Sequence, residues 1–130
     1  MRTAAVAWGM TFFLILGVLI CGCKPEVEKF GEPVDDSAAV TAIATVLANP
    51  QSYLDKDVVM EGTISSECPA GCNLHLRDSS GATIYVEIHG TSFAPIPQRV
   101  GKTARVKGKV YQSEGAEKEI KLFGKGLQIK

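Results

Sequence analysis

The sequence has little of what most enzymes and nucleic-acid-binding proteins need. Its 130 residues include 14 basic and 14 acidic side chains, so the formal net charge is zero, and aromatic residues make up only 7%. Zero net charge argues against a general polyanion binder, and sparse aromatic side chains give single-stranded nucleic acid few surfaces on which to stack. No phosphate-binding glycine loop, nucleophile beside a general base, or pair of catalytic carboxylates stands out. We therefore expect a protein that is not an enzyme, has no cofactor and does not bind nucleic acid.

Charged residues are also scarce at the N-terminus. Arg2 is the only one before Lys24, and residues 4–20 are almost wholly apolar. A basic start followed by an apolar run is typical of a secretory signal. A retained transmembrane anchor is the alternative, although the run is shorter than the roughly 20 apolar residues that a spanning helix needs.

The apolar run ends in LICGCKP, which resembles the lipobox of bacterial lipoproteins. Cleavage there requires a small residue before the cysteine, and Gly22 before Cys23 meets this condition whereas Ile20 before Cys21 does not. We predict a signal peptide over residues 1–22 and a lipidated (palmitate-type, triacylated) Cys23. Several acyl chains hold a protein stably on a membrane. The expected location is the cell envelope, on an inner or outer membrane, facing the periplasm or the exterior.

The rest of the chain reads as a tether followed by one domain. Residues 23–36 are rich in proline and charge and are expected to be flexible, so the domain is assigned to residues 37–130. The stretch DDSAAVTAIATVLANP predicts a leading helix, capped by Asp36 or Ser37 and ended before Pro50. Its expected apolar face comprises Val40, Ile43, Ala44 and Leu47.

Beyond the helix the hydrophobic period changes to two, which predicts five short strands. They are VVMEGTIS, NLHLR, TIYVEIH, TARVKGKVY and EIKLFGKGLQI, the last of them bulged near Gly124 or Gly126. Five strands of this length in one open sheet would leave an apolar face uncovered. We therefore predict a mainly β protein with a closed, five-stranded, Greek-key barrel of the OB type.

The second and third strands form the best-defined hairpin. A three-residue turn ending at Gly81, which can adopt a positive φ, pairs Leu76 with Ile84 and Leu74 with Val86. This register places six polar side chains outward, on the face that OB domains use for ligands. An ordinary solvated face is the alternative. The candidate ligand-binding residues are Asn73, His75, Arg77, Tyr85, Glu87 and His89.

Two cysteines, Cys68 and Cys72, remain in the mature chain if Cys21 and Cys23 are accounted for by the signal and the lipid. In an oxidising compartment such a pair reads first as a structural disulfide. The alternatives are a thiol-redox pair and a copper or zinc site. The metal site would use Cys68 and Cys72 with His75 or His89, because the predicted register sets Gly71 opposite His89. The paired C-x-x-C motifs of a structural zinc site and the C-x-x-C-H motif of c-type haem are absent.

A basic stripe is predicted on the fourth strand. Arg105, Lys107, Lys109 and Tyr111 alternate with the inward Val106 and Val110. Such a stripe is either a solvated face or a surface that meets anionic lipid headgroups.

Two segments carry a family resemblance. LANPQSYLDKDVVMEGTI resembles the opening of small exported bacterial OB-fold domains. The segment from GTISSECPAGCNLHLRDSSG to VGKTARVKGKV resembles an uncharacterised OB-like envelope family with a Cys-x3-Cys hairpin, which usually has Trp where this chain has Asn73. The matching residues are Cys68, Gly71, Cys72, Asp78, Gly81, Gly101, Val106, Gly108 and Val110.

This resemblance implies an OB fold and an envelope location, and no reaction. The expected protein is thus a lipid-anchored binding module. Its partners would be the membrane, through Cys23, and an envelope protein or a small ligand. A small metal-binding or thiol-redox protein is the alternative.

Overall fold

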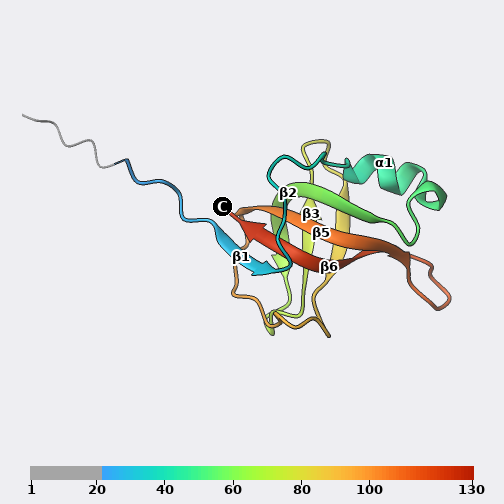
Figure 1. Cartoon of the computed structure of the whole chain (residues 1–130). Coiled ribbons are helices and arrows are strands. Elements are labelled where there is room, and N and C mark those ends of the chain that lie inside the picture. Colours follow the sequence, from blue (N-terminus) through green and yellow to red (C-terminus); the bar gives the residue numbers. More distant parts are fainter. Residues whose placement is uncertain (1–21) are drawn as a thin grey trace, which may run out of the picture.

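The computed structural model describes residues 22–130 (Figure 1). The predicted signal peptide, apart from Gly22, lies outside these residues. Within them no helix is both long and apolar enough to span a membrane. The elements in chain order are β1 (Glu28–Gly31), α1 (Ile43–Ala48), the 3-10 helix η1 (Pro50–Ser52), β2 (Asp57–Glu67), β3 (Asn73–Arg77), β4 (Thr83–Glu87), β5 (Thr103–Gln112) and β6 (Ile120–Ile129).

Five of the six strands close into a barrel. The consecutive strands β2, β3 and β4 pair antiparallel, and β5 returns to pair with β2, which is the Greek-key arrangement. β6 then lies parallel to β4 on one side and antiparallel to β5 on the other, so no barrel strand keeps a free edge. This architecture is that of an OB-type barrel, as the strand pattern predicted.

The alternation of the strands fills the barrel with aliphatic side chains. The inward positions of β3 and β4 are Leu74, Leu76, Ile84 and Val86, all 2% exposed or less. Each such side chain contributes about 1.5–3 kcal/mol when it leaves water. The other residues of the buried hydrophobic cluster are Ile43, Val46, Met60, Ile64, Ile88, Ile96, Ala104, Val106, Val110, Leu122, Leu127 and Ile129.

The β3–β4 hairpin has the predicted register. Leu76 faces Ile84 and Leu74 faces Val86, while His75 faces Tyr85 on the outer side. Gly81 has a φ of 88°, and its N–H donates to the Asp78 carbonyl at 3.0 Å. The predicted bulge in β6 is also confirmed. Lys107 pairs with Gly126 and the next residue, Gly108, pairs with Gly124, so β6 has one extra residue between its two glycines.

The predicted leading helix is wrong in its extent. Only Ile43–Ala48 is helical, and Val40 instead forms a parallel bridge with Val59 on β2. Pairing with the sheet therefore overrides the helical pattern, and Val40 and Leu47 are 47% and 39% exposed, whereas Val46 is buried. Neither Asp36 nor Ser37 caps the helix.

A cap for α1 comes instead from the β3–β4 turn. The Ala44 N–H donates to Asp78 Oδ2 at 3.3 Å, which gives one first-turn N–H group a partner. Asp78 also receives the N–H groups of Ser80 and Ala82 through Oδ1. One carboxylate therefore joins the turn to the helix, and its pKa is lowered, first by the hydrogen bond from the Ser80 side chain.

The expected tether is shorter than predicted. Residues 28–31 form β1, which pairs antiparallel with the end of β6, so the fold begins at Glu28 rather than at residue 37. Arg99 fixes this strand by donating to both carboxylate oxygens of Glu28, each at 2.7 Å. A strand of four residues is too short to show a clear alternation of apolar and polar side chains. Its stability comes mostly from pairing with β6, which the local sequence does not reveal.

Candidate binding face

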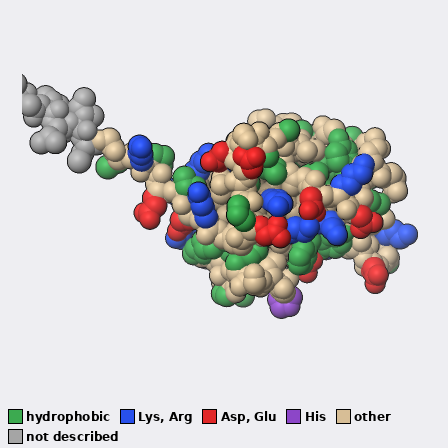
Figure 2. Space-filling model, viewed as in Figure 1, with side chains coloured by type: hydrophobic (Ala, Val, Ile, Leu, Met, Phe, Trp, Pro, Cys, Tyr) green, Lys and Arg blue, Asp and Glu red, His purple; other side chains and the backbone are tan. Residues whose placement is uncertain are grey.

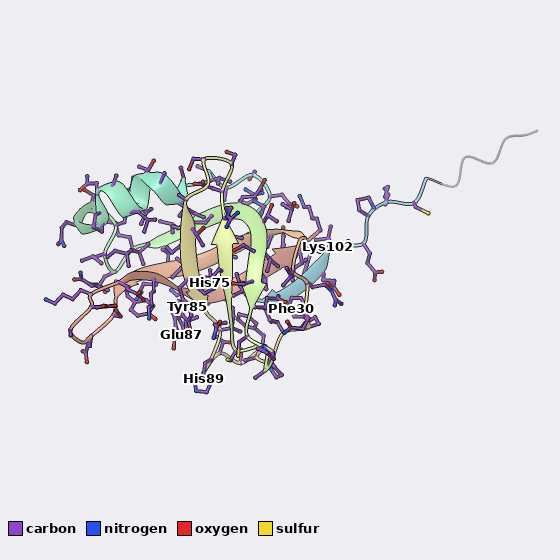
Figure 3. All side chains as sticks on the ribbon, turned by 180° about the vertical axis from the view of Figure 1, so that it is seen from behind. Phe30, His75, Tyr85, Glu87, His89 and Lys102 are labelled. Atoms are coloured by element: carbon purple, nitrogen blue, oxygen red, sulfur yellow. The ribbon has the colours of Figure 1, made fainter. Side chains whose placement is uncertain are left out.

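Polar and aromatic side chains form two rows across the outer surface of four neighbouring strands, β3, β4, β6 and β5. We call this surface the outer face. Strand register sets His75, Tyr85, Lys121 and Tyr111 in one row. The second row contains Asn73, Glu87, Phe123 and Lys109. Figure 3 shows His75, Tyr85 and Glu87 together on this side of the barrel.

Tyr85 lies at the centre of the first row. The His75 ring meets it edge to face, with centroids 5.4 Å apart and an interplanar angle of 79°. Lys121 Nζ lies 4.7 Å from the centroid of the Tyr85 ring, at the distance of a cation–π contact. Burial, and then the charge of Glu87, raise the pKa of the Tyr85 phenol. His75 is held by Ser66, whose Oγ is 2.9 Å from Nδ1.

The second row is tied to the first through Glu87. The Tyr111 hydroxyl donates a hydrogen bond to Glu87 Oε2, although the two residues belong to β5 and β4. Burial, followed by this hydrogen bond and the Glu87 charge, raises the pKa of Tyr111 far above its usual range. Both phenols therefore remain neutral donors at physiological pH.

A hollow of about 350 Å³ opens between Tyr111 and Phe123. Its volume lies at the lower end of the usual range for small-molecule sites. Lys125 at its rim is paired with Asp57, at 2.7 Å. Lys109 has no ion-pair partner within residues 22–130 and lies at the same rim. The complete lining is Glu87, Lys109, Tyr111, Phe123 and Lys125.

A second hollow, of about 420 Å³, lies on the other side of the Tyr85 ring. The exposed Leu47 of α1 and Ile120 of β6 give it apolar walls, and Glu119 stands at its edge. Its lining is Leu47, His75, Thr83, Tyr85, Glu119 and Ile120. The two hollows share no lining residue.

The structure brings together four of the six predicted ligand-binding residues: Asn73, His75, Tyr85 and Glu87. Arg77 is exposed at the end of β3, and His89 is exposed beyond the end of β4, away from the others (Figure 3). Sequence reasoning placed Lys109 and Tyr111 in a separate basic stripe, and it did not name Lys121 or Phe123. The alternation around Leu122 marks Lys121 and Phe123 as outward residues, but only the parallel β4–β6 pairing places them beside Tyr85 and Glu87.

The Cys68–Cys72 loop is tightly held at the base of the barrel. Gln98 Nε2 donates to the Cys68 carbonyl at 2.8 Å, and the Ile96 N–H donates to the Gly71 carbonyl at 3.1 Å. Gly71 therefore faces Ile96, and the predicted pairing of Gly71 with His89 is wrong. The reason is that β4 ends at Glu87 and the following turn bends the chain, so that Cys72 receives the His89 N–H instead.

Both cysteines carry free thiols, each half-buried. A hydrogen bond between them lowers the pKa of Cys68 and raises that of Cys72. In residues 22–130 no three metal-ligating side chains lie close enough to hold an ion, so His75 and His89 do not join this pair.

The predicted basic stripe on β5 is wrong, because two of its three basic side chains are occupied by contacts within the protein. Arg105 is only 6% exposed and donates to the carbonyls of Asp36 and Ala38, at 2.7 and 3.0 Å. Lys107 is paired with Glu32 at 2.9 Å. The N-terminal segment covers this part of β5, and Figure 2 shows acidic and basic side chains interspersed on the visible side.

Comparison with known proteins supports the fold and no more. A scan against protein-family models finds no match, and a search of curated proteins finds none either. The chain is similar in structure to a protein from Leishmania major Friedlin assigned as an aspartyl-tRNA synthetase, with 17% identity and a TM-score of 0.56. That match covers 76% of this chain but only 23% of the other.

A second similar structure is that of ygiW from E. coli. Its identity is 22% and its TM-score 0.45, and the match covers 78% of this chain and 97% of that one. We infer nothing from a likeness at this score. The first match agrees with the OB-type barrel derived from the strand order, and fold alone does not carry an activity from one protein to another.

Proposed function

We propose that this protein is a lipid-anchored, non-catalytic binding module of the bacterial cell envelope, and that its outer face holds the ligand. The observation that carries the proposal is the hollow beside Phe123, which joins apolar walls to an unpaired lysine, Lys109. Ligand sites typically combine an apolar cavity with a few placed polar groups.

The lining favours a ligand with a flat apolar group and a negative charge. The rings of Tyr111 and Phe123 offer an apolar contact, and Lys109 offers a cation at the rim. Lys125 is ion-paired with Asp57, whereas Glu87 accepts a hydrogen bond from the neutral Tyr111, so Lys109 is the lysine of this hollow without an ion-pair partner among residues 22–130. An aromatic carboxylate, free or on a side chain of an envelope protein, has this chemistry.

Nucleic acid fits the outer face less well. A backbone-binding groove needs a continuous basic track with several stacking platforms. Here acidic residues alternate with the basic ones, and the Tyr85 ring is already covered by Lys121. The proposed partner is therefore a small ligand or a protein segment.

Nuclear magnetic resonance tests the location of the site. Isotope-labelled protein would be titrated with a set of aromatic carboxylates and the matching aromatic amines. Amide shifts should cluster around Tyr111, Phe123 and Lys109 for the carboxylates and be smaller for the amines. Shifts clustering elsewhere, for example at the hollow formed by Gly31, Val34 and Gln128, would contradict the proposal.

The anchor is proposed on Cys23, which is exposed and lies ahead of β1. Cells would be labelled with a fatty-acid analogue. Wild type should incorporate it, and Cys23→Ala should abolish incorporation. Loss of the label in Cys21→Ala but not in Cys23→Ala would place the cleavage site elsewhere.

For the cysteine loop we propose a Cys68–Cys72 disulfide in the exported protein. The Gly71 N–H donates to the Cys68 carbonyl at 2.8 Å, which turns the chain between the two cysteines, and the loop is held in place by Gln98 and Ile96. The exported protein would be purified without reductant, denatured and then alkylated. Neither cysteine should gain an alkyl group. Two added groups would refute the disulfide.

A thiol-exchange role is the second candidate function. The observation that favours it is the lowered pKa of Cys68, which increases the fraction of reactive thiolate. A disulfide closing so short a loop constrains the unfolded chain little, so stability alone is a weak reason for the pair.

A further inference from the structure

We propose that the end of the barrel that carries β1 docks on anionic lipid headgroups, through Lys24, Lys102, Lys130 and the exposed Val100. We call these four residues the docking end. The inference rests on the proposed lipid anchor at Cys23 and adds to it an orientation of the domain and a lipid preference.

The linker between Cys23 and the fold is short. Because β1 begins at Glu28, only residues 24–27 separate Cys23 from the fold. A fully extended chain covers at most about 3.3–3.6 Å per residue, so Glu28 stays within roughly 17 Å of the lipidated residue. The tether expected from sequence, which extended to residue 36, would have let the domain move freely. Instead, the end of the barrel at β1 is held close to the headgroups.

Two lysines of the fold lie at the end of the barrel that carries β1. Ile129 is the register partner of Glu28, and the Lys130 N–H donates to the Thr103 carbonyl at 2.9 Å, so Lys130 and Lys102 both lie where the linker enters the fold. Neither lysine has an ion-pair partner within residues 22–130. Figure 3 shows Lys102 beside the start of the linker.

One acidic group nearby is neutralised, because Glu28 is paired with Arg99 at 2.7 Å. Glu67 Oε2 accepts the backbone N–H of Arg99 at 2.6 Å, which is a hydrogen bond and not an ion pair. Lys24, Lys102 and Lys130 outnumber Glu67 and the linker residue Glu26, so an excess of positive charge remains at the docking end, and each basic residue near an anionic membrane strengthens binding by about fivefold.

An exposed apolar side chain, that of Val100, lies at the same end of the barrel. Val100 is 57% exposed, more than either Val40 or Leu47. It occupies a turn between Arg99 and Lys102 that is held to β2, because the Gly101 N–H donates to the Ile64 carbonyl at 2.8 Å. An exposed apolar residue flanked by basic ones is the composition of surfaces that insert shallowly at a membrane interface.

The opposite end of the barrel has the opposite character. The turn between β5 and β6 carries Glu114, Glu117 and Glu119 against Lys118. Ten-residue strands place it about 30 Å from the docking end, at the far right in Figure 1, whereas the linker leaves at the left. This acidic end is repelled by anionic lipid, which reinforces the same orientation.

Fluorescence quenching tests the proposal. The lipidated protein loses Trp8, the single tryptophan of the sequence, with the signal peptide, so one tryptophan would be introduced as Val100→Trp or, as the matched control, Ala116→Trp in the opposite turn. The lipidated mature protein would be reconstituted in vesicles of phosphatidylglycerol or phosphatidylcholine that contain a lipid with a shallow quencher. Flotation of each sample would report attachment separately from orientation.

We expect Val100→Trp to be quenched at least about twofold more strongly in phosphatidylglycerol than in phosphatidylcholine, and Ala116→Trp to be quenched weakly in both. Lys24→Gln, Lys102→Gln and Lys130→Gln together should lower the quenching several-fold while the protein still floats, since each lysine is worth about fivefold. Lys118→Gln should change nothing. Equal quenching at the two positions in floating protein would overturn the docking inference alone. Protein that does not float would overturn the anchor, and the inference with it.

Discussion

The hydroxyl of Tyr111 on β5 donates a hydrogen bond to the carboxylate of Glu87 on β4, spanning the strand that lies between them. The contact connects the two rows of the outer face and places a neutral phenol beside a charged carboxylate. Its strength has a consequence that can be measured at high pH.

Glu87→Gln should bring the pKa of Tyr111 closer to that of an ordinary phenol, because it removes both a charged acceptor and a nearby negative charge. In wild type the folded pKa is raised above the unfolded value of about 10, so the stabilisation is complete below that pH and is lost as pH rises through the folded value. Ultraviolet titration of wild type and Glu87→Gln would measure the pH at which the phenols ionise. Glu119→Gln is the control, and identical titration curves for wild type and Glu87→Gln would show that the contact is absent.

The β3–β4 turn gives a prediction about stability. Gly81→Val should lower the free energy of unfolding by about 1–3 kcal/mol, because a β-branched residue is strained at a positive φ. The space around Gly81 is open, so the loss measures backbone strain rather than a clash. Ser80→Ala should cost much less, since the hydrogen bond that its hydroxyl donates to Asp78 is exposed to water. Similar small losses for both in urea unfolding would contradict the turn.

Arg105 should be the residue that fixes the N-terminal segment. Arg105→Gln removes donors to two carbonyls and should cost about 1.5–3 kcal/mol, the usual value for hydrogen bonds made by a charged group. Lys107→Gln, which removes an ion pair with an exposed carboxylate, should cost under about 1 kcal/mol. A glutamyl endopeptidase should also cut after Asp36, whose carbonyl Arg105 binds, faster in Arg105→Gln than in Lys107→Gln. Equal cleavage rates in the two variants would mean that Arg105 does not hold this segment.

The cysteine pair predicts an order of reactivity. In reduced protein Cys68 should be alkylated by iodoacetamide before Cys72, because the hydrogen bond between the thiols lowers the pKa of Cys68 and raises that of Cys72. Cys72→Ala should slow the reaction of Cys68. Peptide mass spectrometry at timed intervals would measure both rates, and simultaneous alkylation of the pair would refute the assignment.

The sequence was most informative where structure is set locally. The register of the β3–β4 hairpin depends on one turn and one alternating pattern, and both lie within the residues that pair. The barrel followed from counting strands that could not bury their apolar faces singly. The outer-face residues of β3 and β4 followed from the same alternation.

What could not be predicted depends on contacts between distant segments. The β4–β6 pairing brings Phe123 to Glu87, and no local pattern encodes it. Arg105 reads as a surface residue until the carbonyls of the N-terminal segment fold over it. Val40 matches a helical face, yet pairing with β2 is the stronger interaction.

The affinity of an aromatic carboxylate for matched lysine variants is the most direct test of the proposed binding face. Dissociation constants would be measured by calorimetry for wild type, Lys109→Gln at the hollow and Lys118→Gln in the β5–β6 turn. Loss of one charged hydrogen bond is worth about 1.5–3 kcal/mol, so Lys109→Gln should weaken binding by about 10- to 150-fold, while Lys118→Gln should bind as wild type does. Equal affinities for all three folded proteins would contradict the account.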